Sequence, residues 1–370
     1  MTRIRSIELR LVALPLVGPF RTSFGVETDK VCVLARVETD RAVGWGECVT
    51  GPDPGFSEEF NEGVWLVLRE FLAPALFRAG DLEPQDLEPA MAGVRGNPMA
   101  KATLVNGFLD AWLRERGESL ASFLGAERER VECGVSVGIA PSAEALLENV
   151  DGYLAEGYRR IKLKIEPGTD VERVRAVRSA HPDILLSVDA NAAYTLQDVE
   201  VFRELDAFDL LMIEQPLHHE DLVEHAALQR EIRTDLCLDE SIRSAPDAHA
   251  AIGLGACRIV NIKQGRVGGL LEAVRTHDTC RAAGVPVWCG GMLETGVGRA
   301  ANLALAALPG FTLPGDTSAS ARYFAEDLTD PHVLAPDGTM AVPRGPGLGV
   351  EPHPARLEAI TLRTERLSPP

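Results

Sequence analysis

The chain has 370 residues, of which 45% are hydrophobic and 25% are charged, a composition typical of a globular protein with one large domain or two unequal ones. Its formal net charge of −18 argues against nucleic acid or an anionic membrane surface as a partner, since both select basic patches. No apolar run approaches the roughly 18 residues of a membrane span, and the start MTRIRSIELR lacks the apolar core of a signal peptide. We therefore expect a cytoplasmic protein that binds neither nucleic acid nor membrane.

The first 50 residues predict three strands of an antiparallel meander, IRSIELRLVALPL, KVCVLARVET and AVGWGECVT, with a loop GPFRTSFGVETD between the first two. From about residue 57 to residue 116, apolar residues recur at three- and four-residue spacing, which indicates helices. Strands followed by helices without alternation favour an α+β unit. We assign residues 1–130 to this unit, as a capping domain.

After about residue 130, short apolar strands alternate with helices, beginning with VECGVSVGIA and SAEALLENVDGYLAEG and ending with a last strand, FTLPGD. Buried strands with helical crossovers form a parallel sheet, and eight such strands favour closure into a barrel. The predicted fold is α/β, a modified TIM (β/α)8-like barrel of the (β/α)7β type over residues 131–317. The Pro- and Gly-rich segment 318–370 is predicted to pack back on the capping domain.

The seven cysteines are scattered along the chain without a C-x-x-C pair. This pattern indicates neither a disulfide framework nor a zinc ribbon. We expect reduced thiols that are mostly buried.

Charged residues recur at the ends of successive predicted strands. Lys164, Asp189, Glu214 and Asp239 are each 25 residues apart, and Lys263 follows after 24. In a βα barrel the carboxyl ends of the strands converge on one opening, so residues one repeat apart become neighbours around a ring. The spacing therefore predicts a single site at the barrel mouth.

The three acidic residues of this series predict a metal site. A single acid at a strand end is explained by a helix cap or by solvent exposure, but three converging carboxylates would repel one another without a cation between them. All-oxygen ligation points to a hard divalent metal, with Mg²⁺ as the expected ion and Mn²⁺ or Co²⁺ as alternatives. We interpret His218 and His219, in the loop after the fourth strand, as a solvated pair.

The lysines predict an acid/base pair. Lys162 and Lys164 project from the same face of a strand, because side chains alternate with a period of two. We expect the charge of Lys162 to lower the pKa of Lys164, so that Lys164 can act as a base. Lys263 is expected on the opposite side of the ring, with Arg266 lowering its pKa in the same way.

Two lysines on opposite sides of a dication predict chemistry at the α-carbon of a carboxylate. The metal would stabilise the enediolate that forms when the α-proton leaves. One lysine would remove the proton, and the other would either return a proton to the opposite face, giving racemisation, or stabilise the intermediate while a β-leaving group departs. A metal-binding scaffold without catalysis would not need paired bases, so we expect an enzyme.

Five motifs carry a family resemblance: KLK at 162–164, VDAN at 188–191, IEQP at 213–216, LDES at 238–241 and NIKQGRVGG at 261–269. They resemble the muconate-lactonizing subgroup of the enolase superfamily, whose members use a Lys or His base with Mg²⁺. WGECVTGP, VWCGGMLETG and LPGDTSASARYF are similar to motifs of the o-succinylbenzoate synthase and N-acylamino acid (N-succinylamino acid) racemase family. The resemblance covers nearly the whole chain.

The resemblance implies roles for individual residues. Asp189, Glu214 and Asp239 would bind the divalent metal, and Lys164 and Lys263 would be the acid/base pair. The loop 18–25 would reach over the barrel mouth, where its aromatic side chains could exclude water. The residues implied or expected to contact or tune the substrate site are Ser136, Lys162, Asn191, Arg266, Gly291, Met292, Phe20 and Phe24. For Ser136 and Asn191 a helix cap or turn contact is an equally good explanation.

The predicted function is divalent-metal-dependent racemisation of N-acylamino acids, foremost N-succinylamino acids, by two-lysine 1,1-proton transfer. Dipeptide epimerases of the subgroup carry Asp-x-Asp after the eighth strand for a free ammonium, whereas residues 316–318 read Asp-Thr-Ser, so a substrate with a blocked amine, or with no amine, is expected. The alternative is o-succinylbenzoate synthase, which dehydrates 2-succinyl-6-hydroxy-2,4-cyclohexadiene-1-carboxylate in menaquinone biosynthesis, and one protein could have both activities. Cycloisomerisation of a muconate is a third option. The expected partner is a small-molecule carboxylate substrate, and the expected assembly is a homo-oligomer.

Overall fold

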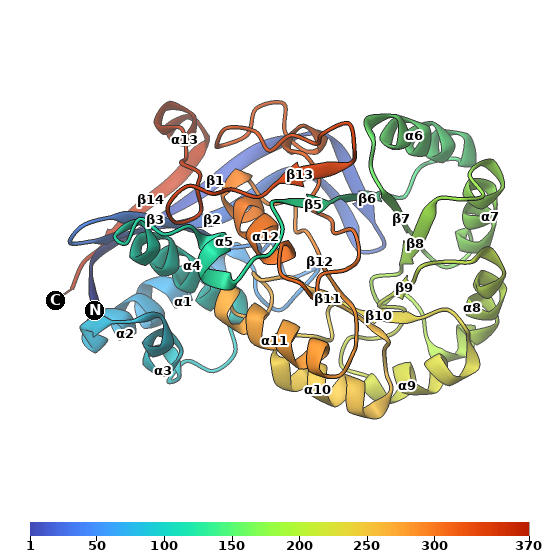
Figure 1. The fold of residues 1–370 in the computed structure, drawn as a ribbon, viewed down its shortest axis with the longest axis horizontal. Helices are drawn as coiled ribbons and strands as arrows, with labels where there is room; N and C mark the ends of the chain where they lie inside the picture. The colour runs from blue at the N-terminus through green and yellow to red at the C-terminus, as the bar shows by residue number, and fades with distance from the viewer. Residues whose placement is uncertain (370) are drawn as a thin grey trace.

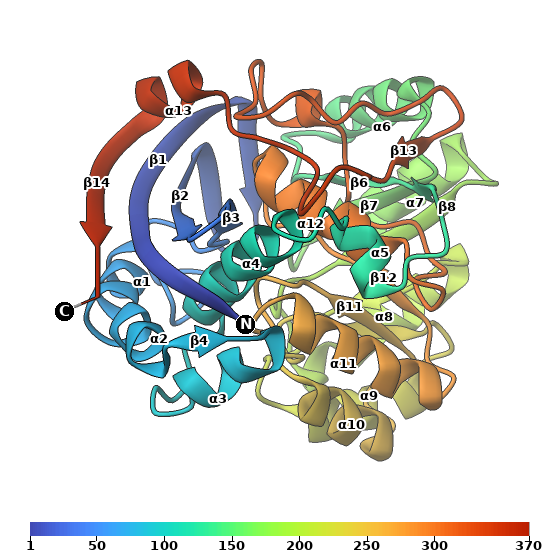
Figure 2. The ribbon, with the colours of Figure 1, turned by 60° about the vertical axis from the view of Figure 1, so that its left-hand side comes forward.

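Three strands at the start of the chain and one at its end form an antiparallel sheet in the computed structural model, which describes residues 1–369. The strands β1 (Thr2–Thr22), β2 (Gly25–Thr39), β3 (Val43–Glu47) and β14 (Thr361–Leu367) pair in the order β14-β1-β2-β3. Figure 2 shows β14 alongside the long, curved β1. The predicted meander is confirmed, and the C-terminal strand completes its sheet.

The predicted loop GPFRTSFGVETD is wrong as a loop. Strands β1 and β2 continue through it, and Thr22 pairs with Gly25 across a two-residue turn. The ladder is irregular near its start, between Ile4 and Ser6, and again between Pro15 and Phe20, where proline offers no N–H to the partner strand. The hairpin tip is held on the barrel, because the Ile139 N–H donates to the carbonyl of Arg21 at 2.9 Å.

Helices follow the sheet, as predicted. They are α1 (Asn61–Val67), the π-helix η1 (Leu68–Leu72), α2 (Ala73–Ala79), α3 (Leu87–Met91), α4 (Pro98–Arg114) and α5 (Leu120–Leu124), with the short β4 (Asp81–Leu82) and η2 (Pro84–Asp86) between them. Helix α4 is buried along most of its length. It packs directly on β3, because a Cβ atom at Gly44 or Gly46 would clash with the α4 backbone.

Parallel strands and helices alternate from residue 134 to residue 306, and the helices lie outside the strands (Figure 1). The parallel sheet runs in the order β12-β11-β10-β9-β8-β7-β6. Its strands are β6 (Gly134–Val137), β7 (Arg160–Lys164), β8 (Leu185–Asp189), β9 (Ile213–Glu214), β10 (Leu236–Leu238), β11 (Ile259–Ile262) and β12 (Val287–Cys289). The helices are α6 (Ala143–Glu156), α7 (Asp170–Ala180), α8 (Val199–Leu205), α9 (Leu222–Glu231), α10 (Ala245–Leu254), α11 (Leu270–Ala282) and α12 (Gly296–Ala306).

The predicted eighth strand, FTLPGD, is wrong as a regular strand. It forms isolated bridges only, from Phe311 to Val287 and from Gly315 to Cys133, since Pro314 between them has no N–H for a continuous ladder. One bridge lies at β12 and the other next to β6, so the segment still closes the ring. The fold is a modified TIM barrel with a capping domain, as predicted.

The remaining elements are short. They are β5 (Arg130–Glu132), which pairs with β13 (Thr339–Ala341), the helices η3 (Leu196–Asp198) and η4 (Asp206–Phe208) before and after α8, the helix η5 (Ser320–Arg322), and α13 (Pro354–Ile360) before β14. All seven cysteines are buried and free, as expected. No helix within residues 1–369 has the length and apolarity to cross a membrane. The domain boundaries at residues 130 and 317 stay a prediction.

A buried carboxylate joins three distant segments of the capping domain. Asp110 of α4 accepts hydrogen bonds from the backbone N–H of Trp45 at 2.8 Å, from that of Leu348 at 2.7 Å and from Arg114 Nε at 2.8 Å. Its side chain is fully buried, so a donor left without an acceptor there would be costly.

Replacing Asp110 with Asn should lower the free energy of unfolding by about 2–4 kcal/mol. The amide NH₂ would face one of the buried backbone N–H donors, and Arg114 would lose its negatively charged partner. Urea unfolding followed by circular dichroism measures the change. The control is Asp81→Asn, which removes an exposed ion pair with Arg3 and should cost less than about 1 kcal/mol. Equal losses in the two variants would contradict this assignment.

Candidate active site

Three carboxylates meet where the strands β8, β9 and β10 end. Asp189 and Glu214 are the last residues of β8 and β9 and are direct partners in the strand register. Asp239 follows β10 immediately. All three are at most 1% exposed, so they are neighbours inside the barrel mouth, where the 25-residue spacing predicts them.

Two ammonium groups approach these carboxylates from β7. Lys164 Nζ lies 2.6 Å from Asp189 Oδ2. Lys162 Nζ lies 2.8 Å from Glu214 Oε2 and 3.2 Å from Asp189 Oδ2. Both lysines thus contact Asp189, which agrees with their predicted placement on one face of the strand.

A third ammonium group and a guanidinium approach from β11. Lys263 Nζ lies 2.7 Å from Asp239 Oδ2, and Arg266 contacts the other oxygen, Oδ1, of the same carboxylate. Arg266 also donates to the carbonyls of Asn261 and Ile242 at 2.7 and 2.9 Å, which fixes its guanidinium. The two cations share Asp239, and the expected effect of Arg266 on the pKa of Lys263 stays a prediction.

The charges at the site shift the pKa values of its members in opposite directions. Burial would raise the pKa of Asp189, but Lys164 and Lys162 hold that pKa below its usual range. Burial and the charge of Asp189 raise the pKa of Glu214. Burial would lower the pKa of Lys162, yet the carboxylates of Asp316, Glu214 and Asp189 raise it. Lys162 therefore stays an ammonium, and its expected effect on Lys164 remains a prediction.

The chemistry of the donor set fits a divalent cation. As the side chains lie, each carboxylate turns toward an ammonium, and no three His, Cys, Asp or Glu side chains of residues 1–369 are arranged to hold a metal ion. Yet three carboxylates at adjacent strand ends form an all-oxygen set. Within the same residues, two buried oxygens nearby, Glu240 Oε2 and Asn261 Oδ1, have no hydrogen-bond partner. A cation with its water shell would satisfy them once the flexible lysine side chains turn aside.

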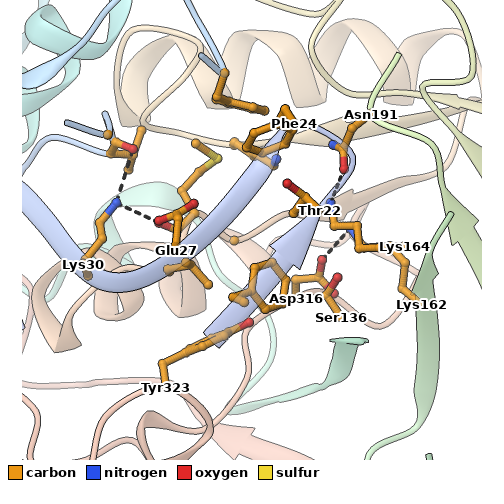
Figure 3. A pocket seen from close by; sticks show the side chains of 18 residues that line it. Thr22, Phe24, Glu27, Lys30, Ser136, Lys162, Lys164, Asn191, Asp316 and Tyr323 are labelled. Atoms are coloured by element: carbon orange, nitrogen blue, oxygen red, sulfur yellow. Dashed lines mark hydrogen bonds and ion pairs between the residues drawn. The ribbon is translucent and has the colours of Figure 1, made fainter. Parts of the chain in front are cut away.

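A pocket extends from these charges to the β1–β2 hairpin of the capping domain. Lys162, Lys164 and Lys263 line it. Figure 3 shows Lys162 beside Asp316 and Lys164 beside Asn191. Further lining residues include all the other predicted substrate contacts except Arg266, namely Ser136, Asn191, Gly291, Met292, Phe20 and Phe24. The structure thus brings the predicted lysines and most of the predicted substrate contacts together around one cavity. The predicted metal ligands Asp189, Glu214 and Asp239 do not line this cavity, but they contact the lysines that do.

The substrate-contact candidates differ in how firmly they are held. Asn191 accepts from Lys164 Nζ at 2.6 Å and donates to Glu240 at 2.9 Å, so it is fixed beside the lysine. The hydroxyl of Ser136 is buried and has no partner among the described residues. Phe20 is 9% exposed, whereas Phe24 is 41% exposed and lies at the solvent end.

The capping domain also fixes the loop after β12. Lys30 Nζ donates to the carbonyl of Met292 at 3.0 Å. Glu47, at the end of β3, accepts from the backbone N–H groups of Thr295 and Gly298 at 3.0 and 2.9 Å, at the start of α12. Both parts of the molecule therefore shape the wall that carries Gly291 and Met292.

Sequence reasoning missed several residues of this region: Arg160, Lys30, Glu47, Phe56, Glu240 and Tyr323. The strand period could have identified Arg160, because it precedes Lys162 by two residues and so shares its face. Sequence offers no comparable signal for Lys30 or Glu47, which reach the site only through packing between the two parts. His218 and His219 stack on each other, with ring centroids 4.4 Å apart, in the loop after β9; neither lines the pocket.

Known protein sequences similar to this chain come from one family of enzymes. A family described as enolase C-terminal domain-like matches residues 145–356. An N-succinylamino acid racemase from an Amycolatopsis species is 56% identical over 97% of this chain and 98% of the relative. An o-succinylbenzoate synthase from Geobacillus kaustophilus is 48% identical over 97% and 96%.

Solved structures agree with this result. A member of the enolase superfamily from Listeria innocua has a TM-score of 0.96 and 39% identity, with both chains covered completely. An N-succinyl Arg/Lys racemase from Bacillus cereus has a TM-score of 0.92 and 26% identity, over 99% of this chain and 100% of the other. Enzymes of this superfamily depend on a divalent metal, generally Mg²⁺. The chain is an enzyme of the enolase superfamily, and it belongs there to the group that contains the N-succinylamino acid racemases and o-succinylbenzoate synthases.

Proposed function

We propose that the enzyme racemises N-acylamino acids, with N-succinylamino acids as the expected class. One of the two lysines Lys164 and Lys263 would remove the α-proton from one face, and the other would deliver a proton to the opposite face. The observation that carries this proposal is the position of the two lysines. They line one pocket from strands four places apart in the sheet. Lys164 contacts Asp189 and Lys263 contacts Asp239, so the lysines approach the row of carboxylates from its two ends.

Asp189, Glu214 and Asp239 would hold the divalent cation, and we expect Mg²⁺. The cation, when bound, would supply positive charge beside the substrate carboxylate and so acidify its α-hydrogen. Lys164 would take the α-proton on one face while Lys263 gives a proton to the other, and the reverse reaction exchanges their roles. Lys162 would remain an ammonium and hold the substrate carboxylate.

The charge balance of the pocket favours a substrate whose amine is blocked. Four lysines, Lys30, Lys162, Lys164 and Lys263, line the pocket together with the carboxylate of Glu27, so a free ammonium would add a charge like that of most of the lining groups. Asp316 also lines it, but its oxygens contact Arg160 at 2.6 Å and Lys162 at 2.7 Å. An N-acyl group removes the positive charge of the substrate amine, which agrees with the name of the 56% identical relative.

A second candidate is the dehydration that forms o-succinylbenzoate. The relative of that name is 48% identical, and the same lysines could serve a β-elimination. Arg266 favours racemisation, because it shares Asp239 with Lys263 and so lies where it could assist proton exchange at this lysine. Dehydration requires Lys263 only as a fixed cation. We propose that this one protein has both activities. We also expect a cytoplasmic location and a homo-oligomeric state.

Replacing Lys164 with Ala should reduce α-proton exchange from one enantiomer of an N-succinylamino acid by about 100-fold or more, because the base on that face is lost. Lys263→Ala should do so for the other enantiomer, while Lys162→Ala should weaken exchange from both. Proton NMR in heavy water measures these rates. Lys101→Ala, which removes a lysine outside the pocket, is the control. If the wild-type enzyme catalyses no α-proton exchange, racemisation is excluded. If Lys164→Ala and Lys263→Ala each lose exchange from both enantiomers, the assignment of one lysine to each face is excluded.

Chelation should abolish α-proton exchange, and added Mg²⁺ should restore it. Asp239→Asn should weaken metal binding by roughly 10- to 100-fold or more, because a charged oxygen donor is lost, and isothermal titration calorimetry measures the affinity. Asp235→Asn is a matched control, since Asp235 precedes the same strand β10 and therefore lies at its opposite end. Equal affinities for Asp239→Asn and wild type would rule Asp239 out as a ligand.

Replacing Arg266 with Gln should slow α-proton exchange by about tenfold more than dehydration, because only exchange needs Lys263 to change protonation state. Each rate is measured on its own substrate under saturating metal. Equal losses in the two reactions would refute the argument that Arg266 favours racemisation.

A further inference from the structure

The inner face of β7 carries three cations in succession. Arg160, Lys162 and Lys164 are two residues apart, and carboxylates lie between them. Asp316 contacts Arg160 at 2.6 Å and Lys162 at 2.7 Å. Asp189 contacts Lys162 at 3.2 Å and Lys164 at 2.6 Å. The charges therefore alternate in sign along the row, and Figure 3 shows three of its members, Asp316, Lys162 and Lys164.

The inner end of this row is fixed. Arg160 is fully buried, donates to the Pro314 carbonyl at 3.0 Å and lies over the Trp288 ring, 4.8 Å from its centroid. A Cβ atom at position 134 would come within 2.8 Å of the guanidinium, so Gly134 leaves the space that Arg160 fills. Asp316 is thus tied to an immobile, permanently charged partner.

The outer end poses an electrostatic problem. Lys162 contacts Glu214 and Asp189, which are two of the proposed metal ligands. A divalent cation on those oxygens would repel an ammonium nearby. Asp316 is the only carboxylate in contact with Lys162, among residues 1–369, that is not a proposed ligand.

We propose that Asp316, anchored by Arg160, is a positioning residue that draws the Lys162 ammonium away from Asp189 and Glu214, so that a divalent cation and Lys162 can occupy the site together. This inference rests on the proposed function for the identity of the metal ligands. The same contact keeps Lys162 at the pocket wall, where a substrate carboxylate could reach it. Lys162 also lies over Trp288, 4.7 Å from the ring centroid, so the ring would help to hold the ammonium at this wall.

The test is Mn²⁺ binding to the full-length protein, measured by electron paramagnetic resonance without substrate. Asp316→Asn should raise the Mn²⁺ dissociation constant by about tenfold, because Lys162 then competes for Glu214 and Asp189. In the Lys162→Met background the same change should have little effect. An unchanged affinity in Asp316→Asn overturns the proposal. An equal loss in the Lys162→Met background also overturns it, because Asp316 would then act through the general fold.

Control variants separate positioning from loss of structure. Asp110→Asn removes another buried carboxylate that is paired with an arginine, far from the pocket, and should leave Mn²⁺ affinity unchanged. If Asp316→Asn does not fold, the double variant Arg160→Met/Asp316→Asn removes both members of the pair and leaves no unpaired buried charge. It should show the same weakening of Mn²⁺ binding, and wild-type affinity in it would overturn the proposal.

Different results contradict the role of Asp316 and the proposed racemisation, so the two proposals can be tested separately. If wild-type enzyme binds Mn²⁺ but exchanges no α-proton, the proposed racemisation fails while the role of Asp316 is still measured. If wild-type enzyme exchanges protons and Asp316→Asn binds Mn²⁺ normally, only the positioning role fails.

Discussion

The site depends on burying carboxylates and ammonium groups together at the barrel mouth. Asp189, Glu214 and Asp239 are almost completely removed from solvent, and each isolated charge would cost several kcal/mol there. Lys162, Lys164 and Lys263 lie within 3.2 Å of these oxygens and offset that cost. The lysines that neutralise these buried carboxylates are therefore the same lysines to which we assign proton transfer and substrate binding.

Much of this arrangement could be predicted from the sequence because a barrel converts chain spacing into position. A repeat of 25 residues places Asp189 beside Glu214, and a strand period of two places Lys162 beside Lys164. Contacts between the two parts of the molecule follow no such period. Lys30 reaches the carbonyl of Met292 from 262 residues away, and only the folded chain reveals that contact.

The two errors in the predicted fold both involve strands near proline. The expected loop at residues 18–25 is a hairpin, because strand pairing resumes after an irregularity that begins at Pro15. The expected eighth strand is reduced to bridges around Pro314. In both places the predicted path of the chain was correct. The pattern of backbone hydrogen bonds, which the sequence did not reveal, determines whether each segment is a regular strand. The pocket wall depends on that difference, since Phe20 and Asp316 both line it.

The pairing of β1 with β14 has a consequence for the order of folding during synthesis. Strand β1 precedes the barrel in the chain, whereas its partner β14 follows the barrel. The barrel strands and helices lie between them and can assemble earlier, while the edge of β1 that pairs with β14 stays open until β14 has been made. The hairpin that borders the pocket belongs to β1, so the sheet that carries this wall of the pocket is complete only after β14 has emerged from the ribosome.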